Sequence, residues 1–167
     1  MAPSKIENYL AQRQAQASLR VRLYGLVDAL LYARASGSPQ LERSTSTIAL
    51  FDGTPDASLA DAGPWLIDFD QTSHAVRQSL FNMGAAPEGV SWLISAYPFE
   101  GLAHELRGHL DARMPDGRTA LLRFYDARLI GDIAALFSLP QRMQFFVSTF
   151  DWLIQINGEL MRVHPNA

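Results

Sequence analysis

Aspartates stand at the ends of three apolar segments of the sequence, where several carboxylates could act together. The segments are LYGLVD, which ends at Asp28, WLIDFD, which ends in Asp68 and Asp70, and LLRFYD, which ends at Asp126. In open α/β sheets, ligands gather at the carboxyl ends of the strands, and carboxylates at these ends could hold Mg²⁺ for phosphoryl transfer. The pattern therefore gives a first hypothesis, a magnesium centre.

The stretch DFDQT, which begins at Asp68, adds to this hypothesis. It matches the D-x-D-x-T nucleophile motif of haloacid-dehalogenase-like phosphatases, and WLIS, residues 92–95, could mimic their second motif. That chemistry needs a cation on the phosphoryl oxygens, normally a lysine. Arginine supplies 13 of the 14 basic residues, and the only lysine, Lys5, precedes the motif. A later acidic pair is also missing, because Asp132 falls in a predicted helix without an acidic residue four positions on. A magnesium-dependent phosphatase that uses Asp68 and Asp70 remains an alternative function.

The same aspartates have a structural interpretation, because each precedes a predicted helix. A side-chain oxygen that accepts from the free amides of a first helical turn stabilises the helix by about 0.5–2 kcal/mol. We expect this capping role for Asp28 and Asp126, whereas Thr72 competes with Asp68 and Asp70 as the cap of the next helix. With this interpretation no catalytic, cofactor or metal site is expected.

Other residue types that carry chemistry give weaker signals. His104 and His109 are five positions apart on a predicted helix, so they point to different sides, and no third metal ligand has suitable spacing. The chain has no cysteine, which excludes disulfides, thiolate metal sites and a cysteine nucleophile. Trp65, Trp92 and Trp152 lie on predicted strands, and we expect them to pack in the core.

Two glycines, Gly101 and Gly108, are seven positions apart on the predicted helix 98–114, on the side opposite its apolar residues. Each glycine costs about 1 kcal/mol relative to alanine inside a helix. The pair could let another backbone approach closely, either a neighbouring loop or a partner chain. The alternative is that both glycines are simply tolerated on a solvated face.

The composition indicates one folded domain that spans residues 1–167, since 48% of the residues are hydrophobic. The net charge of −3 gives no broad basic field, so neither nucleic acid nor an anionic membrane is expected as a partner. The first residues lack the apolar segment of a secretory signal, and no later run reaches the ~20 apolar residues of a membrane span. A cytoplasmic location is therefore expected.

Hydrophobic periodicity and turn residues divide the chain into alternating strands and helices. Ser4 and Glu7 fit a capping box at the first helix, and Asn157-Gly158 is a strong signal for a tight hairpin turn. The expected fold class is α/β, a mixed β-sheet flanked by helices, with an N-terminal helix and a C-terminal β-hairpin. The predicted helices are 4–18, one capped by Asp28 that ends at Ala35, 56–62, 72–83, 98–114, 127–137 and a short one from Pro140, the predicted strands are 20–27, 47–51, 64–69, 90–95, 119–125, 147–156 and 159–163, and residues 36–46 are predicted to form a loop.

Several segments together resemble a known family. They are YGLVDALLY (24–32), LFDGTPDASLADAGPWLIDF (50–69) and SWLISAYPFEGLAHELRGHLDARMPDGRTALLRFYDARL (91–129). They are similar to the effector adaptor, or chaperone, domain of bacterial type VI secretion systems known as Tap or Tec, long filed as a domain of unknown function. The resemblance covers about residues 20–137, and its most specific part is the ordered set of a serine that ends a Trp-containing strand, a helix ending in HL, the PDGR turn and LLRFYD. The family usually has proline where this chain has Ala127, and its longer members continue into a helical C-terminal lobe.

The resemblance implies a protein without catalytic activity. Its partners would be a toxin effector, often bound near the effector's N-terminal region, and the spike-tip protein that receives the effector in the bacterial cytoplasm. From this role we expect an apolar or helical segment of the effector to be shielded in a groove. A small-ligand or regulatory binding domain is a further alternative.

The segment LLRFYD also places a cation, Arg123, inside an apolar run. In an extended strand Arg123 and Tyr125 would share one face. A buried guanidinium without a carboxylate is costly, so we expect Arg123 to be partly buried against Asp28, Asp68 or Asp126. We therefore predict that Asp28, Arg123, Tyr125 and Asp126 form a structural motif that fixes the fold.

Overall fold

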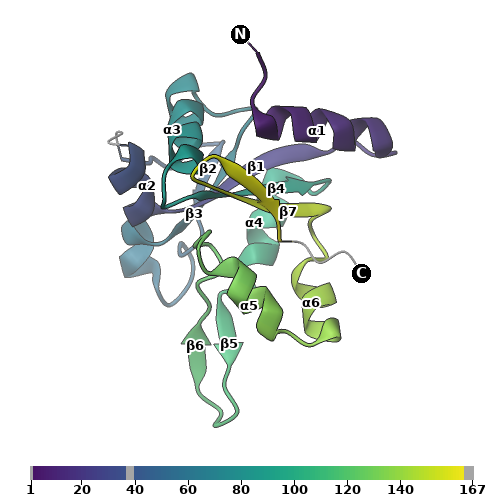
Figure 1. Ribbon diagram of the computed structural model, residues 1–167. Coiled ribbons are helices and arrows are strands. Elements are labelled where there is room, and N and C mark those ends of the chain that lie inside the picture. Colours follow the sequence, from purple (N-terminus) through teal and green to yellow (C-terminus); the bar gives the residue numbers. More distant parts are fainter. Residues whose placement is uncertain (1, 37–39, 164–167) are drawn as a thin grey trace.

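The computed structural model describes residues 2–36 and 40–163 and is built around one six-stranded sheet (Figure 1). The strand order is β2-β3-β1-β4-β7-β8, and β5 and β6 form a separate two-stranded hairpin. The strands are β1 (Arg22–Asp28), β2 (Thr47–Ala49), β3 (Pro64–Asp68), β4 (Val90–Ser95), β5 (Asp111–Arg113), β6 (Thr119–Leu121), β7 (Asp151–Ile156) and β8 (Glu159–Arg162). The helices are α1 (Lys5–Gln16), α2 (Ala29–Ser36), the 3₁₀ helix η1 (Ala57–Ala62), α3 (His74–Ala85), α4 (Phe99–Arg107), α5 (Ile130–Leu136) and α6 (Leu139–Phe145).

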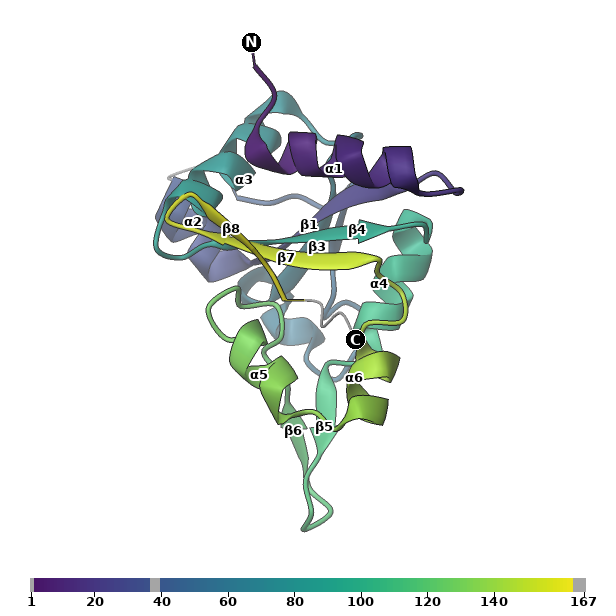
Figure 2. The same cartoon turned by 45° about the vertical axis from the view of Figure 1, so that its right-hand side comes forward.

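Helices cover both faces of the sheet (Figures 1 and 2). α1 and α3 lie over one face, α4, α5 and α6 lie over the other, and the β5–β6 hairpin projects beyond α5 and α6. Neighbouring residues of β1 show the two sides: a Cβ at Gly25 would lie 3.0 Å from Leu80 of α3, whereas Tyr24 stacks on Phe99 of α4 with 5.8 Å between ring centroids. Within the described residues, no helix is both long enough and apolar enough to cross a membrane.

All strand pairs of the sheet are antiparallel within the described residues. β1 lies between β3 and β4 and is antiparallel to both, so β3 and β4 run in the same direction and are joined through α3. The connection is a βαβ crossover with another strand inserted between its two strands, and this explains the strand-helix alternation of the sequence. The predicted α/β class with its N-terminal helix and C-terminal hairpin is confirmed, whereas directly paired parallel strands, which a mixed sheet would include, do not occur among the described strands.

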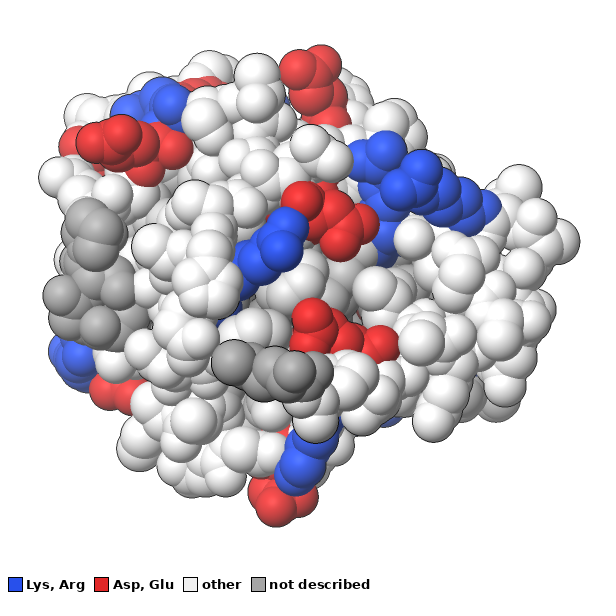
Figure 3. All heavy atoms as spheres, turned by 90° about the horizontal axis from the view of Figure 1, so that it is seen from above, with Lys and Arg blue, Asp and Glu red and all other residues white. Residues whose placement is uncertain are grey.

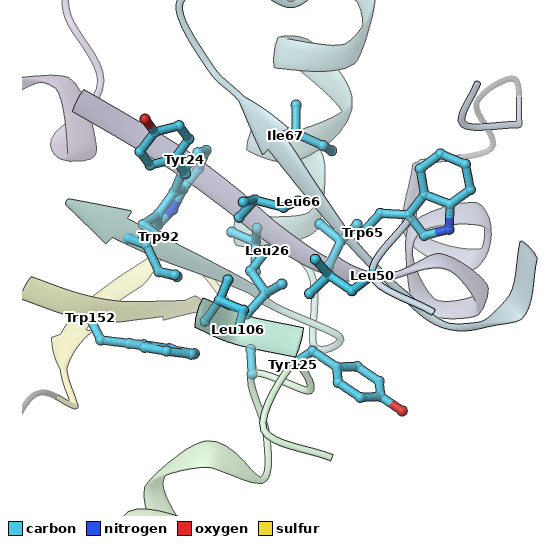
Figure 4. Packing of buried hydrophobic residues seen from close by; sticks show 14 of the residues in the cluster. Tyr24, Leu26, Leu50, Trp65, Leu66, Ile67, Trp92, Leu106, Tyr125 and Trp152 are labelled. Atoms are coloured by element: carbon cyan, nitrogen blue, oxygen red, sulfur yellow. The ribbon is translucent and has the colours of Figure 1, made fainter. Parts of the chain in front are cut away.

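The three tryptophans are core residues, as predicted (Figure 4). Trp65, Trp92 and Trp152 are each at most 1% exposed. The ring centroid of Trp92 lies 6.1 Å from that of Phe81 of α3. Trp152 lies on the opposite side, 5.5 Å from Phe145 of α6. One aromatic layer therefore fixes α3, and the other fixes α6.

The C-terminal hairpin turns at Asn157-Gly158, as the sequence predicts. Both residues have a positive φ, 52° and 81°, as the two central positions of a type I′ turn require. Gly158 is hydrogen-bonded to two distant helices. Its amide donates to the Gly84 carbonyl at 2.8 Å, and Lys5 Nζ donates to its carbonyl at 3.0 Å. The hairpin thus holds the end of α3 and the start of α1.

Several predicted boundaries in the second half of the chain are wrong. The predicted helix 98–114 ends at Arg107, because Gly108 closes it and the next residues pair as β5 with β6. Leu110, four positions after Leu106, is buried and so continues the helical apolar pattern beyond the end of the helix. The predicted strand 119–125 ends at Leu121. Residues 37–39 of the predicted 36–46 loop lie outside the described residues.

Candidate functional site

Asp28, Arg123 and Asp126 meet at the end of β1. Arg123 Nη2 lies 3.2 Å from Asp28 Oδ2 and 3.7 Å from Asp126 Oδ2. The two carboxylate side chains are 5% and 1% exposed, whereas the Arg123 side chain is 50% exposed. Of the three carboxylates expected as partners of Arg123, the structure places these two beside it and Asp68 elsewhere.

Asp28 joins three segments of the chain. Its Oδ1 accepts from the backbone amides of Leu30 and Leu31 at 2.9 and 3.3 Å, which is the capping role expected at the start of α2. Its Oδ2 accepts from Arg123. The last residue of β1 therefore caps a helix with one oxygen and binds the 122–129 segment with the other.

Asp126 shapes a turn instead of capping the next helix, so the predicted helix start at Ala127 is wrong. Its Oδ1 accepts from the Arg128 amide at 2.9 Å and from Arg128 Nε at 3.0 Å, and its Oδ2 accepts from Arg128 Nη2 at 2.8 Å. Aspartate often binds the amide two residues on, and this contact competes with helix capping. α5 begins only at Ile130. Burial alone would raise the pKa of Asp126, but the hydrogen bonds from Arg128 and the charge of Arg123 outweigh it and hold this pKa below its ordinary value.

Tyr125 contributes packing to this cluster. Its side chain is 4% exposed, and its ring centroid lies 6.3 Å from that of Phe51 and 5.8 Å from that of Phe124. Burial raises the pKa of the Tyr125 hydroxyl, while the charge of Arg123 acts in the opposite direction. Tyr125 and Arg123 lie beyond β6, so the predicted shared strand face is wrong. The turn after β6 therefore places the Tyr125 ring in the core and leaves the Arg123 guanidinium half-exposed.

Asp68 lies at the opposite end of the strands from Asp28. The register of β1 and β3 places Tyr24 opposite Asp68 and Asp28 opposite Pro64. Asp68 pairs instead with Arg22, 3.5 Å away, and burial raises the pKa of Asp68. The magnesium hypothesis needed the strand-end carboxylates to be close together, and antiparallel pairing separates Asp68 from the other two. In the described part of the chain, no group of three or more His, Cys, Asp or Glu side chains could hold a metal ion.

The DFDQT stretch is held by hydrogen bonds within the stretch and by Arg77, which donates to the Phe69 and Asp70 carbonyls. The Asp70 amide donates to Asp68 Oδ1 at 3.2 Å, and the Thr72 amide donates to the Asp68 carbonyl at 3.0 Å. Neither Thr72 nor an aspartate caps α3; Ser73 does, because its hydroxyl accepts from the Val76 amide at 3.2 Å. The D-x-D-x-T pattern here forms the turn from β3 to α3.

Gly101 and Gly108 do not share one helix, so that part of the prediction is wrong. Gly101 lies in the first turn of α4, and Gly108 is the residue that follows its last turn. A Cβ at Gly101 would lie 3.3 Å from Pro98 Cγ, and a Cβ at Gly108 would lie 3.3 Å from the Glu105 carbonyl oxygen. The nearest atoms around both glycines belong to α4 and to the turn before it. A role in partner contact stays a prediction.

The two histidines differ in environment. His104 is exposed, whereas the ring of His109 lies 4.9 Å from that of Phe145, and burial lowers the pKa of His109. His109 therefore belongs to the packing between α4 and α6.

A second charged cluster, around Asp151, was not anticipated from the sequence. The Asp151 side chain is 0% exposed and lies 2.6 Å from Arg13 Nε, 2.8 Å from Arg162 Nη2 and 3.2 Å from the Tyr9 hydroxyl. α1 and β8 are thereby fastened to the first residue of β7. The sequence signal was an acid at the edge of the apolar run WLIQI, but its partners lie more than a hundred positions away or on the next strand.

Exposed apolar residues gather around α6, and we name this set the α6 stripe. Two of its members lie on α6, one ends α5, and two follow α6 in the segment before β7. Residues 139–148 are helix and turn, where a strand from 147 had been predicted. The stripe consists of Leu136 (84% exposed), Leu139 (63%), Met143 (67%), Val147 (63%) and Phe150 (41%).

A cavity of about 330 Å³ adjoins the stripe at Phe150. Leu19, which is 59% exposed, lies on its wall. The lining residues are Arg13, Gln16, Ala17, Ser18, Leu19, Val21, Ile94 and Phe150. Phe150 belongs both to the stripe and to the lining of this cavity.

Sequence comparison identifies the family of this chain. The family described as "Domain of unknown function (DUF4123)" matches residues 23–144. The chain belongs to this family. Comparisons with curated proteins and with solved structures find no significant match. The DUF4123 match begins within β1 and ends within α6, so it contains the Asp28–Arg123–Asp126 cluster but not Asp151.

Proposed function

We propose that this DUF4123 protein is a non-catalytic adaptor, or chaperone, for a toxin effector of a bacterial type VI secretion system. It binds the toxin in the cytoplasm and helps to load it onto the spike-tip protein. Membership of DUF4123 supports this proposal, together with the motifs in residues 24–32, 50–69 and 91–129 that resemble effector adaptors.

The observation that carries the proposal is the α6 stripe. Large apolar side chains usually lie in the core, and a contiguous exposed set often marks a surface for another protein. The stripe exposes five large apolar side chains within residues 136–150, and one of them, Met143, adapts to varied partners.

The charged clusters support a scaffold role for the aspartates. Asp28, Asp126 and Asp151 each accept hydrogen bonds from arginines, and Asp28 and Asp126 also accept them from backbone amides. Their oxygens are therefore occupied by the protein itself. On the face that carries α1, charged residues form small separate groups on a largely uncharged surface, which offers little to a polyanion (Figure 3).

Co-expression with the toxin of an adjacent gene tests the proposal. The adaptor should co-purify with the toxin and raise its soluble fraction. A phosphatase would instead hydrolyse a phosphoester with Mg²⁺, and Asp68→Asn would abolish turnover. Soluble toxin that never associates with this protein would refute the adaptor function.

A further inference from the structure

We propose that Asn157 is a site of spontaneous deamidation, and that the hydrogen bonds between its turn and α3 hold this modification back in the folded protein. The proposal is independent of the adaptor function. It rests on the Asn157-Gly158 sequence, on the exposure of Asn157 and on the contacts that the turn makes with α3 and α1.

The turn supplies both reacting groups. In deamidation the backbone nitrogen of the following residue attacks the side-chain carbonyl carbon, so a bond forms between Gly158 N and Asn157 Cγ. The bond from Cγ to the side-chain nitrogen breaks, and ammonia leaves with the proton that Gly158 N gives up. Water then opens the cyclic imide and leaves aspartate or isoaspartate. Glycine has no Cβ to hinder the attacking nitrogen, and Asn157 is the only asparagine of the chain that glycine follows.

Asn157 differs from two other asparagines of the chain in its surroundings. It is exposed at the tip of the β7–β8 hairpin, so water, the second reactant, reaches it. Asn8 and Asn82 instead lie within α1 and α3, and they are followed by tyrosine and methionine, whose side chains crowd the attacking nitrogen. These two residues are therefore internal controls for the reactivity of Asn157.

The attacking nitrogen is engaged in the folded protein. The Gly158 amide donates to the Gly84 carbonyl at 2.8 Å, so the proton that must leave is held at the end of α3. The Asn157 amide donates to the Ala86 carbonyl at 3.1 Å, and Lys5 Nζ donates to the Gly158 carbonyl at 3.0 Å. These bonds fix the peptide groups on both sides of Asn157. The nitrogen can turn toward Asn157 Cγ only when the turn leaves α3, so the reaction rate follows the population of this open form.

Isoaspartate would change the geometry of the turn. Its backbone runs through the former side chain and is longer by one methylene, which a two-residue type I′ turn does not accommodate. Gly158 would then move away from Gly84 and Lys5, and the hairpin would release the end of α3 and the start of α1. We therefore expect the isoaspartate form to melt at a lower temperature than the unmodified protein.

Comparison of the folded and the unfolded chain tests the proposal. The wild-type protein is incubated at mildly alkaline pH, with and without guanidinium chloride. Mass spectrometry then follows Asn157 in the peptide that trypsin releases between Arg142 and Arg162, because replacement of the side-chain NH₂ by OH changes the mass of the peptide. The same digest reports Asn8 and Asn82.

A matched pair of alanine variants tests the role of α3. A Cβ at Gly84 would lie 2.5 Å from Gln155 Oε1, and release of the hairpin relieves this clash, so Gly84→Ala favours the open turn. Gly131→Ala makes the same change within α5, where the Cβ would lie in open space. Thermal melting verifies that both variants fold, and the comparison in the wild type does not depend on either of them.

We expect Asn157 to deamidate in the unfolded chain well before Asn8 and Asn82, and at least about tenfold more slowly in the folded wild type. Gly84→Ala should raise the rate in the folded protein about fivefold, the factor that corresponds to about 1 kcal/mol of relieved strain, and Gly131→Ala should keep the wild-type rate. An unreactive Asn157 in the unfolded chain would overturn the site. Equal rates in the folded and unfolded wild type, or equal rates in folded Gly84→Ala and wild type, would overturn the protective role of α3.

Discussion

Asp151 is the carboxylate whose charge should matter most to the fold, and Asp151→Asn removes that charge with little change of shape. The side chain is fully buried and accepts from Arg13 Nε at 2.6 Å, from Arg162 Nη2 at 2.8 Å and from the Tyr9 hydroxyl at 3.2 Å. In the variant the two guanidinium groups face a neutral amide whose NH₂ group cannot accept a hydrogen bond.

The expected loss is about 2–3 kcal/mol of unfolding free energy, from the following balance. Removing one partner of a buried ion pair costs roughly 3–5 kcal/mol. The Arg13 and Arg162 side chains are 32% and 31% exposed, so both can turn partly to water, which reduces this cost. The asparagine oxygen also retains one acceptor. For a domain of this size, such a loss corresponds to a fall in melting temperature of about 5–10 °C.

Urea denaturation at neutral pH measures this loss, with Asp61→Asn as the matched control. The Asp61 side chain is 69% exposed and 3.6 Å from Arg43, so its substitution should cost less than about 0.5 kcal/mol. Hydrogen exchange adds a local readout. α1 buries only Ile6 fully, so it depends on the Asp151 contacts, and its amides should exchange faster in Asp151→Asn.

A loss below about 1 kcal/mol, or unchanged exchange in α1, would refute the reasoning. Either result would mean that the two arginines are as well solvated without the carboxylate as with it, and that apolar contacts alone hold α1 on the sheet.

Four further substitutions probe the scaffold. In a urea titration, Arg123→Ala should lower the free energy of unfolding by about 1 kcal/mol, because a half-exposed guanidinium gains little from its ion pairs. Toxin binding should persist. Unchanged stability together with lost binding would place Arg123 in the interface. The lowered pKa of Asp126 means that its ionised form stabilises the fold above about pH 4, and that this contribution disappears as the pH falls through the folded-state pKa. The stability difference between wild type and Asp126→Asn should therefore shrink in acid, and a difference that stays constant from neutral to strongly acidic pH would contradict this. Gly84→Ala should destabilise the fold by about 1 kcal/mol, since its Cβ would lie 2.5 Å from Gln155 Oε1. Gly131→Ala in α5 places its Cβ in open space and should stabilise the fold by about 0.5–1 kcal/mol. Thermal melts that rank the two variants the other way would count against this packing.

The sequence predicted the elements whose signals are local. The capping box of Ser4 and Glu7 is present at α1, β4 has the predicted bounds of 90–95, and the hairpin turns at Asn157-Gly158. Each of these depends on residues within a few positions of one another, so periodicity and turn chemistry were sufficient.

The sequence misled where tertiary contacts decided the outcome. Strand direction is set by pairing, and insertion of β1 between β3 and β4 moved Asp28 and Asp68 to opposite ends of the sheet. Asp126 precedes an apolar helical pattern, but its carboxylate accepts hydrogen bonds from Arg128, two positions later, and does not cap the next helix. The sequence pattern identified the candidate residues, but it did not show which of them lie in contact in the fold.

The α6 stripe escaped prediction for a different reason. Residues 139–150 are rich in apolar side chains, so those that pack inward cannot be separated from those that face solvent by hydrophobicity alone. The structure separates them, because Phe145 and Phe146 pack on Trp152 while Met143 and Val147 face solvent.

β7 links the scaffold to the proposed interface, because its consecutive residues serve opposite faces of the sheet. Asp151 binds Arg13 of α1 on one face, and Trp152 packs against Phe145 of α6 on the other. If the aspartates are scaffold and the α6 stripe is the interface, their variants must separate in two measurements. Asp151→Asn should lower the melting temperature and leave the dissociation constant of the folded protein unchanged, whereas Met143→Lys should change the dissociation constant and leave the melting temperature unchanged. Substitutions at both positions that changed both quantities in proportion would mean that the fold and the binding surface are one cooperative unit.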